Sequence, residues 1–210
     1  MSLSNYTQLQ AAVASWAARQ DMTDVIPDFV ALVEARLRRI LRGRDGVVRT
    51  SLVLSAAAND LPGDIVEPRS LYLTGTGVEG PIDIVTPEDL HRRKRSWGSA
   101  TGVPKWGAIV GSELLLVPTP DDSYAAELVY MAEITPLAEA GSGTNWVLTN
   151  HPDIYLFGAL SEAEPFLKND ERMALWQRKY DQALAELRLH QDRAEFGSNS
   201  PAVRPSHVLG

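Results

Sequence analysis

The spacing of apolar residues changes twice along the 210-residue chain. Near both ends, large apolar side chains recur every three or four residues, which is the spacing of amphipathic helices. Between Val47 and Ile134 the apolar runs are short, rich in β-branched residues and separated by turn residues, as in β-strands. The pattern therefore predicts an α+β protein in which helical segments flank a β-rich middle.

Two helices are predicted in the first 46 residues. The first carries an apolar stripe of four residues, Tyr6, Leu9, Val13 and Trp16. The second begins near Pro27, because proline suits the first turn of a helix. Its last turn is rich in arginine, and the helix dipole favours cations there.

Six strands are predicted in the middle of the chain: Val47–Leu54, Ser70–Leu73, Ile82–Val85, Ala108–Val110, Leu114–Val117 and Ala126–Ile134. One short helix, from Pro87 to about Lys94, interrupts them. The turn residues from Pro120 to Ser123 predict a hairpin between the strand at 114–117 and the strand at 127–131. We therefore expect an antiparallel sheet or a small sandwich.

Helical spacing returns after a loop rich in small residues. Asn150 can cap a helix that runs to about Phe166. The longest helix starts at Asn169 or Asp170 and runs to about Glu195. Beyond it the chain contains two prolines and few large apolar groups, so we expect a flexible tail.

These elements predict three structural parts and a tail. A four-helix body is built from both ends of the chain, residues 1–46 and 136–196, and residues 47–135 form an antiparallel β-rich insertion. Residues 197–210 form the flexible C-terminal tail. Three tryptophans lie on or beside helical stripes and are expected in the core: Trp16, Trp146 and Trp176.

Composition narrows the classes of function. The chain has no cysteine, which excludes disulfides, thiolate metal sites and cysteine nucleophiles. Its net charge of −7 argues against a protein that coats nucleic acid non-specifically. No run of 18 apolar residues occurs and the N-terminus is polar, so neither a membrane span nor a signal peptide is expected.

The motifs that could indicate catalysis or cofactor binding lie in the wrong sequence context. The run from Gly75 to Gly80 matches G-x-G-x-x-G, but a strand pattern follows it where a nucleotide site needs a helix. We interpret it as a hairpin turn. The four histidines are far apart in the sequence, and there is no G-x-S-x-G motif. We therefore predict neither an enzyme nor a bound cofactor or metal.

Two basic patches are the most distinctive charged features. One lies at the end of the short middle helix, just before Trp97, and contains Arg92, Arg93, Lys94 and Arg95. The other lies at the end of the second helix and contains Arg36, Arg39 and Arg42. Each is open to two interpretations: a solvated helix end, or a surface that contacts phosphate or a partner.

Several short motifs, taken in order, resemble the head–tail adaptor (connector) proteins of short-tailed and related bacteriophages. They are Tyr6-Thr7-x-Leu9-Gln10 leading to Trp16, Ile26-Pro27-Asp28-Phe29, Ala35-Arg36-Leu37-x-Arg39, Thr101-Gly102-x-Pro104, Leu114-Leu115-Leu116-Val117-Pro118-Thr119-Pro120, Thr144-Asn145-Trp146-Val147-Leu148, the run from Pro152 to Leu160, and Asp170-Glu171-Arg172 with Trp176. Each motif alone is weak, and their order along one chain is the stronger signal.

The resemblance implies a structural protein of the virion, made in the host bacterial cytoplasm and located at the head–tail junction. It implies a ring, commonly of twelve subunits, that joins the portal protein to tail tube or nozzle proteins. DNA would pass through the ring without sequence-specific contacts. The resemblance implies no active site and no membrane partner.

The tail matches no family pattern, so its role is inferred from its chemistry. Arg204 offers a bidentate donor for a carboxylate, and three apolar residues can fill small pockets: Val203, Val208 and Leu209. These four residues are candidates for binding the portal. Two other classes of function stay open, a nucleic-acid-binding module and a virion-associated hydrolase. The second would need an acid–base or metal constellation that the sequence does not contain.

Overall fold

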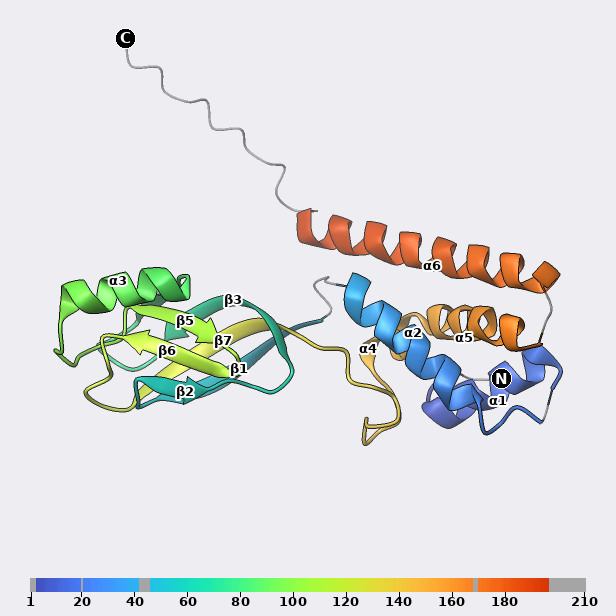
Figure 1. Cartoon of the computed structure of the whole chain (residues 1–210), viewed down its shortest axis with the longest axis horizontal. Helices are drawn as coiled ribbons and strands as arrows, with labels where there is room; N and C mark the ends of the chain where they lie inside the picture. Colours follow the sequence, from blue (N-terminus) through green and yellow to red (C-terminus); the bar gives the residue numbers. More distant parts are fainter. Residues whose placement is uncertain (1–2, 20, 42–45, 168–169, 197–210) are drawn as a thin grey trace, which may run out of the picture. The chain divides into compact units, whose positions relative to one another are not determined.

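Both ends of the chain contribute to one folded unit, and the middle of the chain forms another (Figure 1). The computed structural model describes residues 3–19, 21–41, 46–167 and 170–196. We call Met1–Gly46 with Ile134–Gly210 the helical unit, and Val47–Glu133 the β unit. Each unit has its own hydrophobic core.

Five helices lie in the described part of the helical unit: α1 (Tyr6–Ala17), α2 (Ile26–Ile40), α4 (Trp146–Asn150), α5 (Pro152–Leu167) and α6 (Asp170–Phe196). Capping residues fix several of their starts. The side chain of Asn5 accepts a hydrogen bond from the Gln8 N–H at the start of α1. Pro27 occupies the first turn of α2, where its missing N–H costs nothing.

The prediction of a four-helix body is wrong, although the α+β class is right. A fifth helix, α4, has only five residues, too few for a helical spacing of apolar residues to be recognised. The Asn145 side chain starts it by accepting a hydrogen bond from the Leu148 N–H at 3.0 Å. With α3 of the β unit, the described residues form six helices. The predicted tail lies outside the described residues.

Helices α2, α5 and α6 approach closely around Gly158. A Cβ atom at this position would lie 2.9 Å from Cγ2 of Val33 on α2 and 3.0 Å from Cε2 of Tyr180 on α6. Real Cβ contacts are not this short, and both neighbours are buried. Only glycine therefore allows this packing distance without a shift of the neighbouring side chains.

A buried carboxylate ties α2 to the chain that returns from the β unit. Oε1 of Glu34 accepts hydrogen bonds from the Leu137 N–H at 2.7 Å and from the Tyr155 hydroxyl at 3.4 Å. The Asn145 side chain donates to the same tyrosine hydroxyl at 2.7 Å. Burial raises the pKa of Glu34 above its ordinary value, and the hydrogen bonds oppose that shift.

The β unit is a mixed sheet of seven strands in the order β1-β7-β3-β4-β5-β6-β2. The strands are β1 (Val47–Leu54), β2 (Ala58–Asp60), β3 (Ile65–Leu73), β4 (Gly80–Ile84), β5 (Trp106–Val110), β6 (Glu113–Val117) and β7 (Tyr124–Ala132), and α3 spans Pro87–Trp97. The pair β4–β5 is parallel, and the expectation of a purely antiparallel insertion is therefore wrong. The helix α3 provides the crossover that a parallel pair requires.

The predicted hairpin between β6 and β7 does not form. β6 pairs with β5 and β2, whereas β7 pairs with β1 and β3. The turn residues at 120–123 do reverse the chain, but turn chemistry does not determine which strands become neighbours. The short edge strand β2 was missed because Asn59 and Asp60 were interpreted as turn residues.

The first and last strands of the β unit are paired along their whole length. Val47 lies opposite Met131 at one end, and Leu54 lies opposite Tyr124 at the other. Neighbouring strands in a sheet are about 4.8 Å apart. The chain therefore enters and leaves the β unit at adjacent points.

The G-x-G-x-x-G run links β3 to β4, where Leu73 pairs with Gly80. Gly77 has φ +83°, a conformation that favours glycine. The interpretation of this run as a hairpin turn is confirmed.

We predict that Gly158→Ala lowers the free energy of unfolding by about 1–3 kcal/mol, because the added methyl group overpacks the contact with Val33 and Tyr180. Chemical denaturation measures the loss. Gly141→Ala is the matched control, since nothing lies within 4 Å of a Cβ atom there. Equal stability of the two variants would contradict the close approach.

The second prediction concerns the buried carboxylate. The pKa of Glu34 is higher in the folded state than in the unfolded state. Its contribution to the free energy of unfolding is therefore fully present below the unfolded-state pKa and is lost as pH rises through the folded-state pKa. Glu34→Gln keeps an acceptor for the Leu137 N–H without the charge. Relative to the wild type, this variant should gain stability as pH rises from about 4 to 7.

Glu34→Ala is the contrasting variant. It leaves the Leu137 N–H without its acceptor and should be about 1–3 kcal/mol less stable than Glu34→Gln at every pH, because neither variant titrates at this position. Denaturation midpoints measured across the same pH range test both variants. A pH-independent difference between wild type and Glu34→Gln would show that the carboxylate is not desolvated.

Candidate functional site

The helix α3 lies on the β unit with its basic residues toward solvent. The Thr86 side chain caps its N-terminus by accepting a hydrogen bond from the Asp89 N–H at 3.3 Å. Leu90 is buried and clusters with Ala108 of β5 and Val117 of β6. One side of the helix is thus fixed to the sheet, and the predicted basic patch occupies the remainder.

Cations and tryptophan rings alternate along this surface. The Arg93 guanidinium lies 4.8 Å from the centre of the Trp106 ring, and the Lys105 ammonium lies 4.8 Å from that of Trp97. The two indole rings meet edge to face with centroids 5.9 Å apart. Each cation–π contact at an exposed site contributes about 0.5–1 kcal/mol. Part of the basic run therefore holds α3 on β5.

The remaining cations of the patch divide into paired and unpaired groups. Arg92 forms an ion pair with Asp89, one turn earlier on the same helix. The side chains of Lys94 and Arg95 are exposed and have no ion pair or hydrogen bond with any residue that the structure describes. These two side chains are free to meet an anionic partner.

Two surface clefts border α3. One, with a volume of about 360 Å³, is lined by Asp89, Arg92, Arg93 and Ser96. The other, of about 200 Å³, lies at the C-terminal end of the helix and is lined by Lys94, Trp97, Gly98, Ser99, Ala100, Val117, Pro118 and Thr119. The second cleft combines an exposed aromatic ring with an unpaired cation, a combination suited to holding a side chain of a partner.

The second predicted patch is only partly available. Arg36 forms an ion pair with Glu162 of α5, and its guanidinium lies 5.4 Å from the centre of the Tyr180 ring on α6. It therefore holds three helices together rather than facing a partner. Arg39 is exposed, and Arg42 lies outside the described residues.

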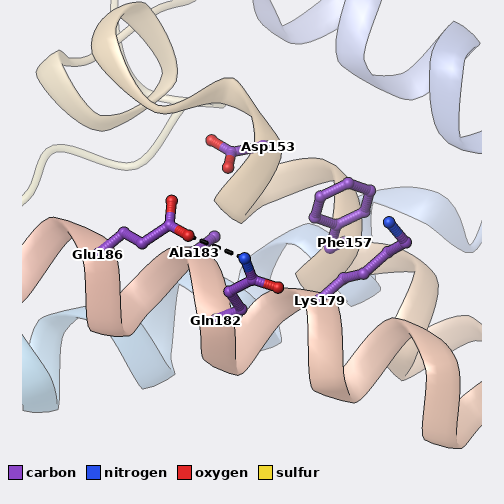
Figure 2. A pocket seen from close by; sticks show the side chains of 6 residues that line it. All are labelled: Asp153, Phe157, Lys179, Gln182, Ala183 and Glu186. Atoms are coloured by element: carbon purple, nitrogen blue, oxygen red, sulfur yellow. Dashed lines mark hydrogen bonds between the residues drawn. The ribbon is translucent and has the colours of Figure 1, made fainter.

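A further pocket, which the sequence did not suggest, lies in the helical unit (Figure 2). It is lined by Asp153, Phe157, Lys179, Gln182, Ala183 and Glu186, from α5 and α6. Gln182 donates a hydrogen bond to Glu186 at 2.9 Å, and Lys179 lies over the Phe157 ring. Its volume of about 140 Å³ is well below the 300–1,000 Å³ typical of small-molecule sites.

Histidine and carboxylate side chains are scattered over the fold. Within the described ranges, no group of three or more histidine, aspartate or glutamate residues could hold a metal ion. His91 lies on α3, His151 follows α4 and His190 lies on α6, while His207 is outside those ranges. The same part of the chain contains no helix long and apolar enough to cross a membrane.

Comparison with protein-family models identifies one match, described as SU10 adaptor protein, over residues 4–205. The chain belongs to the SU10 adaptor protein family. The match extends over both units of this adaptor, which agrees with the phage head–tail adaptor that the sequence motifs resembled. The adaptor matches no curated protein. As a phage adaptor it is a component of the virion, associated with other virion proteins.

The adaptor's tryptophans do not all lie in the core. Trp176 is 7% exposed, which confirms its predicted position, but Trp16 is 45% exposed. The Phe157 ring stacks on Trp176 at 6.1 Å, and Trp16 covers the edge of this cluster. Trp16 was expected in the core because it continues the apolar stripe of α1. Near the end of the helix, however, this stripe reaches the surface of the helical unit. Trp146 is partly buried against the core.

The third prediction tests the buried indole. Its Nε1 donates to the buried Glu164 carboxylate at 2.9 Å. Trp176→Ala should lower the free energy of unfolding by about 3–5 kcal/mol through loss of packing, and Trp176→Phe by about 1–3 kcal/mol because the carboxylate loses its donor. Leu175→Ala, at a neighbouring exposed position, should stay within about 0.5 kcal/mol of wild type. A loss below about 1 kcal/mol for Trp176→Ala would contradict a packing role.

Proposed function

We propose that the protein is a structural head–tail adaptor that assembles as a ring, of twelve subunits, beneath the phage portal. The ring links the capsid to tail tube or nozzle proteins and surrounds the channel through which DNA passes. The family match over residues 4–205 is the observation that carries the proposal. The match itself identifies an adaptor, whereas portal binding, the ring and its subunit number are part of the proposal.

The division into two units supports an adaptor role. The helical unit and the β unit each bury their own core, so each can present a surface to a different partner. A linking protein needs two such surfaces. The described pockets are small or open, which suits contacts with protein side chains better than with a substrate.

The charge distribution supports passage of DNA rather than its retention. The net charge is −7, and a protein that held DNA firmly would neutralise many phosphates with cations. We propose that Arg39 and Arg42, together with the α3 patch from Arg92 to Arg95, are interface or channel residues. Arg36 and Arg92 already form ion pairs with Glu162 and Asp89, so the proposal depends more on the other cations.

The tail is proposed to bind the portal. Arg204 would pair with a carboxylate, and Val203, Val208 and Leu209 would fill small apolar pockets. These residues follow α6, the longest helix, and lie outside the described part of the structure. Ordering of such a segment on binding would reduce the affinity for a given contact area.

The fourth prediction tests portal binding and the tail together. The full-length protein should co-sediment with rings of its cognate portal protein, and truncation after Phe196 should weaken this binding at least about tenfold, the equivalent of about 1.4 kcal/mol. Far-ultraviolet circular dichroism and the melting midpoint should not change. A full-length variant with Val203, Arg204, Val208 and Leu209 replaced by serine separates the tail's chemistry from its length.

Two results would contradict these assignments. Unchanged affinity of the truncated protein would remove the tail from the interface. Failure of the full-length protein to bind the portal, together with salt-sensitive retention on heparin, would favour a nucleic-acid-binding module instead.

A further inference from the structure

The tip of the β5–β6 hairpin carries an exposed row of three side chains. Val110 lies opposite Glu113, and Glu113 lies opposite Asp60 of the edge strand β2. Cross-strand partners point to the same side of a sheet, so the three form a line across the strands. Val110 is 47% exposed, and both carboxylates are exposed.

The two carboxylates of this row lack a cation. Directly opposed like charges destabilise a strand pair, yet neither the Asp60 nor the Glu113 carboxylate has an ion pair or a hydrogen bond with any residue in the described ranges. A nearby cation from another molecule would relieve the repulsion. An apolar contact at Val110 would add specificity to such a pairing.

A complementary surface lies at the other end of the same hairpin. Trp106 pairs with Val117 there, and the 200 Å³ cleft next to them is lined by Trp97, which is 38% exposed, and Lys94. Arg95 is the second unpaired cation among the described residues of this patch. The cleft offers apolar surface and one lining cation, Lys94, with Arg95 next to it on α3, and the tip offers two carboxylates and an apolar side chain.

The two surfaces cannot meet within one molecule. Trp106 and Val110 are four residue steps apart along β5, which is about 13 Å at the rise of a β-strand. When a surface at one end of a molecule is complementary to a different surface at its other end, copies of the molecule associate head to tail. Such heterologous contacts close into rings when the rotation between copies permits it.

We propose that the tip row of one copy, Val110, Glu113 and Asp60, docks on the Trp97 cleft of the next copy. Val110 enters the cleft, and the two carboxylates face Lys94 and Arg95 of the neighbouring molecule. The inference deepens the proposed ring and rests on that proposed function for the closure of the contact. It assigns the β unit a direct role in joining adjacent subunits.

The charges favour a second copy over nucleic acid as the partner of this surface. Arg92 is paired with Asp89, while Arg93 and Lys105 are stacked on tryptophan rings. Two unpaired cations remain in the described part of the patch, and so few would release few counterions from DNA. The carboxylates at the tip match the number of those free cations.

The contact should be weak between free subunits. Its ion pairs are exposed, so each contributes about 0–1 kcal/mol and is screened by salt. Weak pairwise contacts allow subunits to remain separate in solution and to join when a partner holds them side by side. A measurement must therefore trap the contact rather than rely on a stable oligomer.

The absence of native cysteine makes trapping straightforward. Val110→Cys places a thiol at the tip, and Ser99→Cys places one at the cleft, which Ser99 lines. Neither substitution changes the charges of the two surfaces. In concentrated full-length protein, a short bis-maleimide should join the double variant into dimers, trimers and larger species. Each single variant should give at least about tenfold less product. Equal product from a single variant would indicate a symmetric or random contact and would overturn the inference.

Charge reversal on the double-cysteine background provides the specificity test. Glu113→Lys and Lys94→Glu should each lower the cross-linked yield at least about fivefold, and their combination should restore it. Glu113→Lys also removes the repulsion with Asp60, so its melting midpoint should not fall. Loss of cross-linking through misfolding would instead lower that midpoint. Failure of the combined variant to recover the yield would overturn the inference.

Two further readouts distinguish this contact from DNA binding and from portal binding. Duplex DNA that competes with cross-linking, and that depends on Lys94 and Arg95 for binding, would replace the second copy with nucleic acid as the partner. Portal binding is measured separately. Normal portal binding without cross-linked species would reject the inference and leave the proposed function intact. Cross-linked species without portal binding would support the contact between copies and reject the proposed portal binding.

Discussion

One buried carboxylate, that of Glu34, links the two chain segments that form the helical unit. Glu34 lies on α2, before the β unit, and its two hydrogen-bond donors, Leu137 and Tyr155, come after it. Leu137 is 103 residues away along the chain. A carboxylate buried without donors is strongly unfavourable, so α2 reaches its stable arrangement only when the returning chain docks. This contact joins the two chain segments of the unit and makes its folding depend on non-local contacts.

The sequence located most elements but not their neighbours. The strand at Val47–Leu54 coincides with β1, because alternating and β-branched residues report on strand formation locally. The pairing of β6 and β7 was wrong because it was inferred from a turn, while the strands' partners are set by packing across the whole sheet. The short α4 was missed because its signal lies in one capping residue, Asn145. Length therefore limited what periodicity could reveal.

The candidate site shows the same division between local and distant information. The basic run on α3 is visible in the sequence, but its cation–π contacts are not. Trp106, which lies under Arg93, and Lys105, which lies over Trp97, both follow an intervening loop. The tryptophans at both ends of that loop were the available signal. Arg36 appeared to be part of a surface patch, yet it pairs with Glu162, 126 residues away. Charge clusters show where cations lie along the chain, and only the fold shows which of them are already used.

The pairing of β1 with β7 has a consequence for how the β unit can be replaced. Because Val47 and Met131 are opposite each other, the chain enters and leaves the β unit at neighbouring points. To the helices it is equivalent to a long surface loop with neighbouring ends, which can be replaced without rerouting the chain. An exchange of residues 47–133 for another segment with adjacent ends would leave the residues of the helical unit unchanged. The Glu34 contact would be preserved, since Leu137 and Tyr155 both lie outside the exchanged segment.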